Sequence, residues 1–332
     1  MNPEPPMHIH QAETNPRALR SQRWRERRQL LVSNQSVIDP REFAADVIPA
    51  ALAKRFVETH HYSASFPASR LAIGLFRNGA AGLSRLVGVA VFSVPMNDAA
   101  VRRHTGLRSP SAGVDLGRFC LLDEVEANGE TWMLARAFRL LRREKPGVEA
   151  VISYADPMPR ISATGEIIKP GHVGLILQAH GGGSSKTLAY RGRSAARVEY
   201  LTPDARPFSP RAISKIRNGE SGQAYGIDQL VRGGARPPRP AESARTWFDD
   251  LVRSGFFVRR RHPGNHVFAY ALTAQARRAA EGLVSAPFPR LDPAVSRTEV
   301  TALPLFVAAE KARLRGAGEA VAQPPLPQER AG

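Results

Sequence analysis

Residues 114–156, VDLGRFCLLDEVEANGETWMLARAFRLLRREKPGVEAVISYAD, constrain the fold of this chain more than any other segment. An apolar stretch, an acidic loop, an amphipathic stretch and a second apolar stretch follow one another, which predicts strand, loop, helix and strand. A helix that connects two strands indicates that the strands are parallel, and active clefts open at the carboxyl ends of parallel strands. Asp156 lies at that end and Arg118 lies in the neighbouring strand. The segment therefore predicts an enzyme core with a carboxylate and a cation near one cleft.

The chain is strongly basic, with 47 lysines and arginines against 30 aspartates and glutamates and a net charge of +17. Most of these cations are arginine, whose planar donor fork suits phosphate, so the composition indicates a polyanionic partner. Solubility, or a coding bias toward arginine, is the alternative explanation of the same excess. The single cysteine, Cys120, excludes an intrachain disulfide framework and a cysteine-rich zinc site.

The sequence contains no apolar run of membrane-spanning length, and its first thirty residues are too polar for a signal peptide. We therefore expect a soluble protein of the cytoplasm with no membrane partner. The length allows one substantial core with a smaller appendage. The composition along the chain predicts four parts: a basic, largely disordered arm at 1–42, a catalytic domain at 43–200, a basic helix and hairpin extension at 201–272, and a short helix with a disordered Pro/Ala-rich tail at 273–332.

Hydrophobic periodicity gives the expected elements of the catalytic domain. It predicts a helix at 44–59, strands at 71–76 and 85–94, and a polar connection at 96–112. After Asp156 it predicts a loop at 158–171, then a short helix up to residue 181 and a strand at 186–192.

The extension has 12 lysines and arginines against 6 aspartates and glutamates over residues 201–272. Its pattern predicts helices at 209–219 and 243–255, followed by two strands around a type II turn at Pro263 and Gly264. A helix followed by a basic hairpin suits either a wing on a phosphate backbone or a lid packed on the main sheet. His262 and His266 flank this turn, and cross-strand placement explains them more simply than a metal site does.

Arg118 is the cation that most needs explanation. The alternation of Leu116, Arg118, Cys120 and Leu122 places these four side chains on one face of the expected strand. An arginine among apolar residues is costly unless it is paired. Its partner is Asp156, a substrate phosphate or a backbone carbonyl, so a site role and a structural ion pair both remain open.

The loop before the central helix is a candidate binding site for a donor molecule. Asn128 is placed to cap the helix, and free amides at such an entry commonly bind phosphate. Four acidic residues of the same loop, Asp123, Glu124, Glu126 and Glu130, would repel a phosphate. Capping is therefore the expected role, and the candidate cofactor-binding residues are Asn128, Gly129 and Thr131.

The run His60-His61-Tyr62-Ser63 follows the expected first helix. Two histidines and a carboxylate form the facial triad of non-haem iron sites, so His60, His61 and Asp156 are one candidate metal set. Adjacent histidines usually point in different directions. A role as general base or in substrate positioning for His61 or Tyr62 is the preferred hypothesis.

Several short motifs occur in an order that resembles the Mom family of phage-type DNA modification proteins. They are HHYS at 60–63, LGRFCLLDEVEANGETW at 116–132 with the helix after it, VISYAD at 151–156, GHVGLILQAHG at 171–181 and TLAYRG at 187–192. The resemblance covers roughly residues 43–220 and depends on the shared order and spacing of the motifs. It implies a mixed, splayed α/β sheet with flanking helices, as in the GNAT N-acetyltransferases.

The resemblance also implies an activity, the conversion of adenine in DNA to its N6-carbamoylmethyl form, which protects phage DNA from restriction in the host bacterial cytoplasm. Double-stranded DNA is then the partner. By matching motif position, it implies the site residues Asp156, Arg118, His61, Tyr62 and Ser63. The donor stays open between acetyl-coenzyme A and another acyl or aminoacyl group, and iron is retained as an alternative cofactor.

Phosphate contacts are expected from the arginines and lysines that follow the catalytic segment. The candidates are Arg191, Arg193, Arg211, Lys215, Arg217, Arg259, Arg260 and Arg261. Two other functions fit parts of the sequence: an acetyl-coenzyme A-dependent N-acyltransferase acting on a protein or small amine, and a non-catalytic DNA-binding accessory protein.

Overall fold

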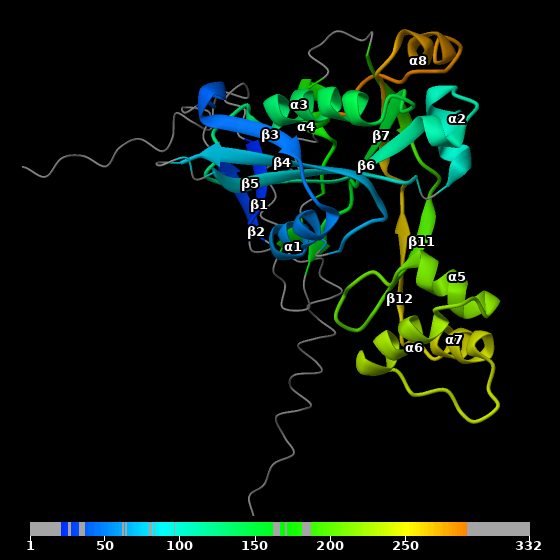
Figure 1. Ribbon diagram of the computed structural model, residues 1–332. Coiled ribbons are helices and arrows are strands. Elements are labelled where there is room, and N and C mark those ends of the chain that lie inside the picture. The colour runs from blue at the N-terminus through cyan, green and yellow to red at the C-terminus, as the bar shows by residue number, and fades with distance from the viewer. Residues whose placement is uncertain are drawn as a thin grey trace, which may run out of the picture.

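The computed structural model has a mixed central sheet with helices on both of its faces (Figure 1). It describes residues 21–25, 28–32, 37–61, 63, 65–79, 82, 84–95, 97–161, 167–169, 171–180 and 187–290. Within these ranges seven strands pair in the order β10-β13-β7-β6-β5-β4-β3. Their bounds are β3 Phe43–Val47, β4 Ser69–Asn78, β5 Ser84–Ser93, β6 Gly113–Leu121, β7 Ala150–Ala155, β10 Leu188–Arg193 and β13 His266–Ala271.

The unit of strand, helix and strand expected at 114–156 is confirmed as β6, α3 (Gly129–Glu144) and β7. β6 and β7 are parallel, whereas the other neighbouring pairs of this sheet are antiparallel. The parallel register joins only Gly113–Asp115 to Ala150–Ile152. Beyond these residues the two strands part, and we call this parting the fork.

Each face of the sheet is covered by its own helices. α3 and α4 (Leu175–His180) pack on one face through Met133, Leu141 and Leu177. α1 (Ala50–His60) covers strands β4 to β6 on the other face, and α2 (Asp98–Thr105) with α8 (Ala274–Ala279) covers β7 and β13 there. The expected mixed α/β sheet with flanking helices is confirmed. No helix within the described residues is both long and apolar enough to cross a membrane.

A bulge in β6 changes which side chains share a face. Val91 pairs with Arg118 but the next residue, Phe92, pairs with Leu116, so Gly117 is the extra residue. A bulge of this kind exchanges the faces of the side chains that follow it. Leu116 consequently packs in the hydrophobic core between the sheet and α3, whereas Cys120 packs in the core between the sheet and α1. The expectation that Leu116 shares a face with Arg118 and Cys120 was wrong for this reason.

A separate lobe, residues 197–262, is inserted between β10 and β13. It begins with β11 (Arg197–Leu201), continues through α5 (Pro210–Asn218), α6 (Gln223–Arg232) and α7 (Ala244–Arg253), and ends with β12 (Val258–His262). β11 and β12 pair as a ribbon that carries the three helices away from the sheet (Figure 1). Phe208, Trp247, Phe248 and Phe257 form the buried core of this lobe.

The strands on either side of Pro263 and Gly264 do not form the expected hairpin. β12 pairs with β11, whereas β13 lies between β10 and β7 in the main sheet. The sheet therefore takes a central strand from the segment that was expected to form a C-terminal extension. The expected boundary at residue 200 divides elements that are neighbours in space.

Several other elements differ from the expectations. Residues 43–47 form edge strand β3 where a helix was expected, and the expected connection at 96–112 contains α2 and a short 3-10 helix, Pro110–Ala112. The expected loop at 158–171 contains the short strands β8 (Arg160–Ile161) and β9 (Ile167–Lys169). In the expected arm, β1 (Ser21–Arg25) and β2 (Arg28–Val32) pair as antiparallel strands. The expected tail beyond residue 290 lies outside the described residues.

The bulge predicts that Gly117→Ala destabilises the protein. A Cβ at residue 117 would lie 2.3 Å from Ser93 Oγ and 3.1 Å from Pro67 Cγ, so we expect a loss of roughly 1–3 kcal/mol in the free energy of unfolding. Gly147→Ala is the matched control, because a Cβ there meets no atom within 4 Å. Denaturant unfolding of both variants measures the difference, and equal stabilities would contradict the bulge geometry.

Candidate active site

The bulge at Gly117 directs Arg118 toward the loop that follows α1. Its Nε donates to the backbone oxygen of Ser65 at 2.8 Å, and its Nη2 donates to Ser65 Oγ at 2.7 Å. These bonds satisfy two sides of the guanidinium with one residue. Ser65 was not among the predicted site residues, because a serine in a turn-rich run carries no distinguishing pattern.

Hydrogen bonds continue from Ser65 to His61 through residues 61–65, which we call the site loop. Ser65 Oγ donates to Ser63 Oγ at 3.4 Å, and Ser63 Oγ lies 2.9 Å from His61 Nδ1. The backbone nitrogen of Ser63 also donates to Nδ1, at 3.2 Å. Nδ1 therefore acts as an acceptor, and a neutral His61 carries its proton on Nε2. Three of the candidate residues, His61, Ser63 and Arg118, belong to one network, whereas Tyr62 lies outside the described residues.

Asp156 follows the last residue of β7, as expected. Its Oδ1 accepts hydrogen bonds from the backbone nitrogen of Met158 at 2.9 Å and from His262 Nε2 at 3.0 Å. His262 is fully buried at the end of β12. His262 was expected to flank a hairpin turn, because nothing local to HPGNH indicates contact with a carboxylate 106 residues earlier.

The fork also contains two residues that the sequence analysis did not select. Asp115 is buried at the last paired position of β6, opposite Ile152. Tyr154 packs against the hydrophobic core between the sheet and α2, on the same face as Ile152. Burial first, and then the charge of Asp115, raise the pKa of the Tyr154 phenol. The phenol therefore stays protonated and able to donate a hydrogen bond near neutral pH.

The structure does not assemble the candidate iron site. Within the described residues, no group of three or more His, Cys, Asp or Glu side chains is placed to hold a metal ion. The His60 ring packs against Phe56, with 4.7 Å between ring centroids, whereas His61 faces Ser63. The two adjacent histidines thus contact different neighbours.

The loop before α3 differs from a simple capped entry. Asn128 occupies the N-cap position with a left-handed φ of 66°, and its side chain makes no capping hydrogen bond. Thr131 Oγ1 donates to the Asn128 backbone oxygen at 3.0 Å. Gly129 is closely packed, because a Cβ there would lie 2.5 Å from Val125 Cγ1. The expected capping role of the Asn128 side chain was wrong, and the role of this loop toward a donor stays a prediction.

The acidic residues of this loop are paired with arginines of the neighbouring strands. Arg77 of β4 bonds Glu126, and Arg85 of β5 bonds Glu124. Arg77 also lies over the ring of Phe43, 4.8 Å from its centroid. These arginines offset the negative charge that the sequence alone assigns to the loop.

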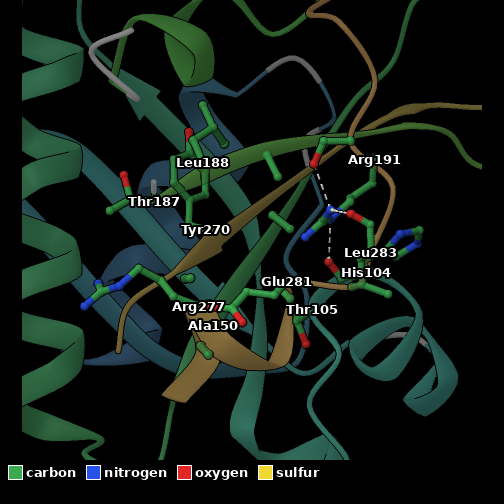
Figure 2. Close-up of a pocket in the computed structure, with 16 residues that line it drawn as sticks. His104, Thr105, Ala150, Thr187, Leu188, Arg191, Tyr270, Arg277, Glu281 and Leu283 are labelled. Atoms are coloured by element: carbon green, nitrogen blue, oxygen red, sulfur yellow. Dashed lines mark hydrogen bonds between the residues drawn. The ribbon is translucent and has the colours of Figure 1, made fainter. Parts of the chain in front are cut away.

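One of the expected DNA contacts, Arg191, is committed to the interior. Figure 2 shows it in the wall of a cavity of about 200 Å³ between β10, α2 and α8. Its guanidinium donates to the backbone oxygens of His104, Leu283 and Val284 and to Ser285 Oγ. Burial lowers the pKa of Arg191. We therefore assign Arg191 to holding the segment after α8 against the sheet.

The other candidate phosphate contacts fall into two groups. Arg211, Arg217 and Arg260 are paired with Glu220, Asp249 and Glu199, respectively. Lys215 is half-buried in α5. Three exposed arginines, Arg193, Arg259 and Arg261, make no side-chain hydrogen bond or ion pair with a described residue. Arg259 and Arg261 share the face of β12 opposite to Arg260.

Comparison with known proteins finds similarity in the central segment of the chain. The model of the Mom protein family matches residues 42–181. The methylcarbamoylase Mom of Escherichia phage Mu is 31% identical over 141 residues, which cover 42% of this chain and 52% of the phage protein. The chain thus spans about half the length of this curated relative. The resemblance to the Mom family is confirmed for this segment, which contains the site loop, the fork and Asp156 but not the lobe.

Buried histidines predict that stability falls in mild acid. Burial, and then nearby arginines, lower the pKa of His104 and His266 below the usual 6.5. The unfolded chain binds more protons than the folded one below that pH, so stability present above about pH 6.5 is lost as pH falls toward the folded-state pKa values. Thermal unfolding at about pH 7.5 and 5.5 should give the lower Tm at the acidic pH. His266→Leu should reduce this difference; an unchanged Tm in the native protein would contradict the prediction.

Proposed function

We propose, from the match of residues 42–181 to the Mom protein family, that this chain is a DNA-modifying enzyme. In the proposed reaction it is a transferase that converts adenine in DNA to an N6-carbamoylmethyl derivative and so protects phage or prophage DNA from restriction. The observation that carries the proposal is that the matched segment contains both the Arg118 network and Asp156. The basic composition of the chain supports a nucleic acid as the partner.

The proposed chemistry needs a proton acceptor and precise placement. The exocyclic amine of adenine is a poor nucleophile, because its lone pair is delocalised into the ring. A new bond from N6 to the donor carbon forms as N6 loses one proton and the donor loses its leaving group. Holding the amine against the donor and removing that proton are the contributions that an enzyme can make.

Asp156 is the proposed acceptor for the N6 proton. It ends β7 beside the fork, and two donors hold one of its oxygens, Oδ1. Arg118 is proposed to orient the donor molecule, because Ser65 fixes the position of its guanidinium and a positioned cation can polarise a carbonyl. Extrusion of the adenine from the duplex would bring N6 within reach of Asp156.

DNA contacts are proposed on the exposed face of the ribbon in the lobe. Arg259 and Arg261 lie there, and Arg193 lies where β10 ends. Exposed arginines whose side chains have no partner among the described residues can exchange counterions for a phosphate backbone at little cost. The ribbon ends at His262, which bonds Asp156. Contacts made on the ribbon would therefore set the position of the duplex relative to the site.

Nucleoside analysis tests the proposed activity. The full chain is expressed in bacteria, total DNA is digested to nucleosides, and modified deoxyadenosine is measured by mass spectrometry. We expect a new adenosine species with the mass of an N6-carbamoylmethyl group. An unmodified profile under good expression, with and without a co-infecting phage, would refute the proposal. A modified protein or small amine in place of DNA would identify an N-acyltransferase instead.

Asp156→Asn should abolish modification and spare DNA binding. Asparagine keeps an acceptor oxygen for Met158 and His262 but cannot take a proton, so we expect a loss of about 100-fold or more. Asp228→Asn, an exposed position on α6, is the control and should retain full activity. Modification level and the Kd for a labelled duplex are measured for each variant. Loss of modification and binding together would assign Asp156 a structural role.

The double variant Arg259→Ala/Arg261→Ala should weaken binding to DNA of any sequence. Each lost phosphate contact lowers the slope of log K against log salt by about 0.9, so we expect a change of roughly 2. Arg139→Ala/Arg142→Ala removes the same charge from exposed positions of α3 and is the control. Equal slopes for the two double variants would place the duplex elsewhere.

A further inference from the structure

The inserted lobe delivers one buried side chain to the proposed site. β11 and β12 pair from Arg197 and His262 to Leu201 and Val258, so His262 lies at the end of the ribbon that joins the sheet. Its side chain is completely buried, and its Nε2 lies 3.0 Å from Asp156 Oδ1. His262 lies outside residues 42–181, the segment that matches the Mom protein family.

The turn after β12 determines which ring nitrogen of His262 carries the proton. The backbone nitrogen of Gly264 donates to His262 Nδ1 at 3.0 Å, so Nδ1 acts as an acceptor. The neutral ring then carries its proton on Nε2 and donates it to Asp156. Gly264 has a φ of 89°, and a Cβ there would lie 2.0 Å from the Ser194 backbone oxygen. The turn therefore requires glycine at this position.

A buried carboxylate with two arginine partners lies next to His262. Glu199 of β11 is buried, and its Oε1 lies 3.9 Å from His262 Nε2. Arg260 and Arg197 bond the Glu199 carboxylate at 2.8 Å and 3.3 Å. Placing charged groups in the interior is costly unless they are paired. Here the paired charges lie beside the hydrogen bond between His262 and Asp156. The lobe thus places His262 and a group of paired charges next to one carboxylate of the sheet.

A second buried histidine of the same segment provides an internal comparison. His266 lies four residues further along, in β13, and is 3% exposed. Its Nδ1 bonds the Tyr190 hydroxyl at 2.7 Å. Tyr190 has no place in the proposed reaction. A purely structural need for buried histidines would make His262 and His266 equivalent.

We infer that His262 is a positioning residue that orients the Asp156 carboxylate, and that the inserted lobe is therefore part of the active site. The inference rests on the proposed function, because it assigns a purpose to Asp156 as proton acceptor. The backbone of Met158 and the side chain of His262 both bond Oδ1, so the lobe supplies the side-chain donor that orients the carboxylate relative to a flipped adenine. Precise orientation of a reacting group contributes directly to the rate.

A matched set of variants of the full chain tests this inference. In His262→Gln the side-chain nitrogen can occupy the place of Nε2 and donate to Asp156, whereas in His262→Asn it reaches only the place of Nδ1. His262→Leu removes the donor, and His266→Leu is the structural control. For each variant we measure Tm, the Kd for a labelled duplex of about 30 base pairs, and the modified adenosine in cellular DNA.

We expect His262→Asn and His262→Leu to lower modification about 10- to 100-fold with a duplex Kd within about twofold of the native value. His262→Gln should restore modification to within about threefold, and His266→Leu should lower Tm without lowering modification. Equal modification by the His262→Gln and His262→Asn variants would overturn the inference. The comparison of these two variants decides the outcome if His262→Leu does not fold. A native protein that modifies no DNA would refute the proposed function itself, whatever the variants do.

Discussion

The extra residue at Gly117 is the constraint on which the arrangement of the site depends. Without it, Arg118 would lie on the α3 face with Leu116 and Phe119 would face α1, because side chains alternate along a strand. With it, the guanidinium reaches Ser65 and joins the network that ends at His61. One unpaired backbone position thus connects a core strand to the site loop.

The structure divides the support of the site between two parts of the chain. The segment that matches the Mom family supplies Arg118, the site loop and Asp156, whereas the lobe supplies His262 and the buried charges behind it. β13 explains how this division arises, because it enters the centre of the main sheet directly after the lobe ends. The lobe is therefore connected at both of its ends to sheet strands, and its ribbon ends at the residue that contacts Asp156.

Local patterns predicted the central unit of the fold but not its long-range partners. β6, α3 and β7 carry strong periodicity, so their type and order were correct. β3 was misread, because the alanines of FAADV also suit a helix and its strand pairing depends on β4. β13 was assigned to a hairpin, because a Pro-Gly turn is a local signal whereas pairing with β7 and β10 is not. Arg118 and Asp156 could be selected from their strands, but Ser65 and His262 become visible only when distant segments are brought together.

Photocrosslinking tests directly whether the target base is bound near Arg118 and Asp156, beside the fork and on the face of the sheet that α1 and α2 cover. A duplex that carries one photoreactive adenine analogue is irradiated with the full chain, and the crosslinked peptides are identified by mass spectrometry. We expect crosslinks within the site loop and around Tyr154 and Asp156. Crosslinks confined to α3 and α4, on the opposite face of the sheet, would contradict it.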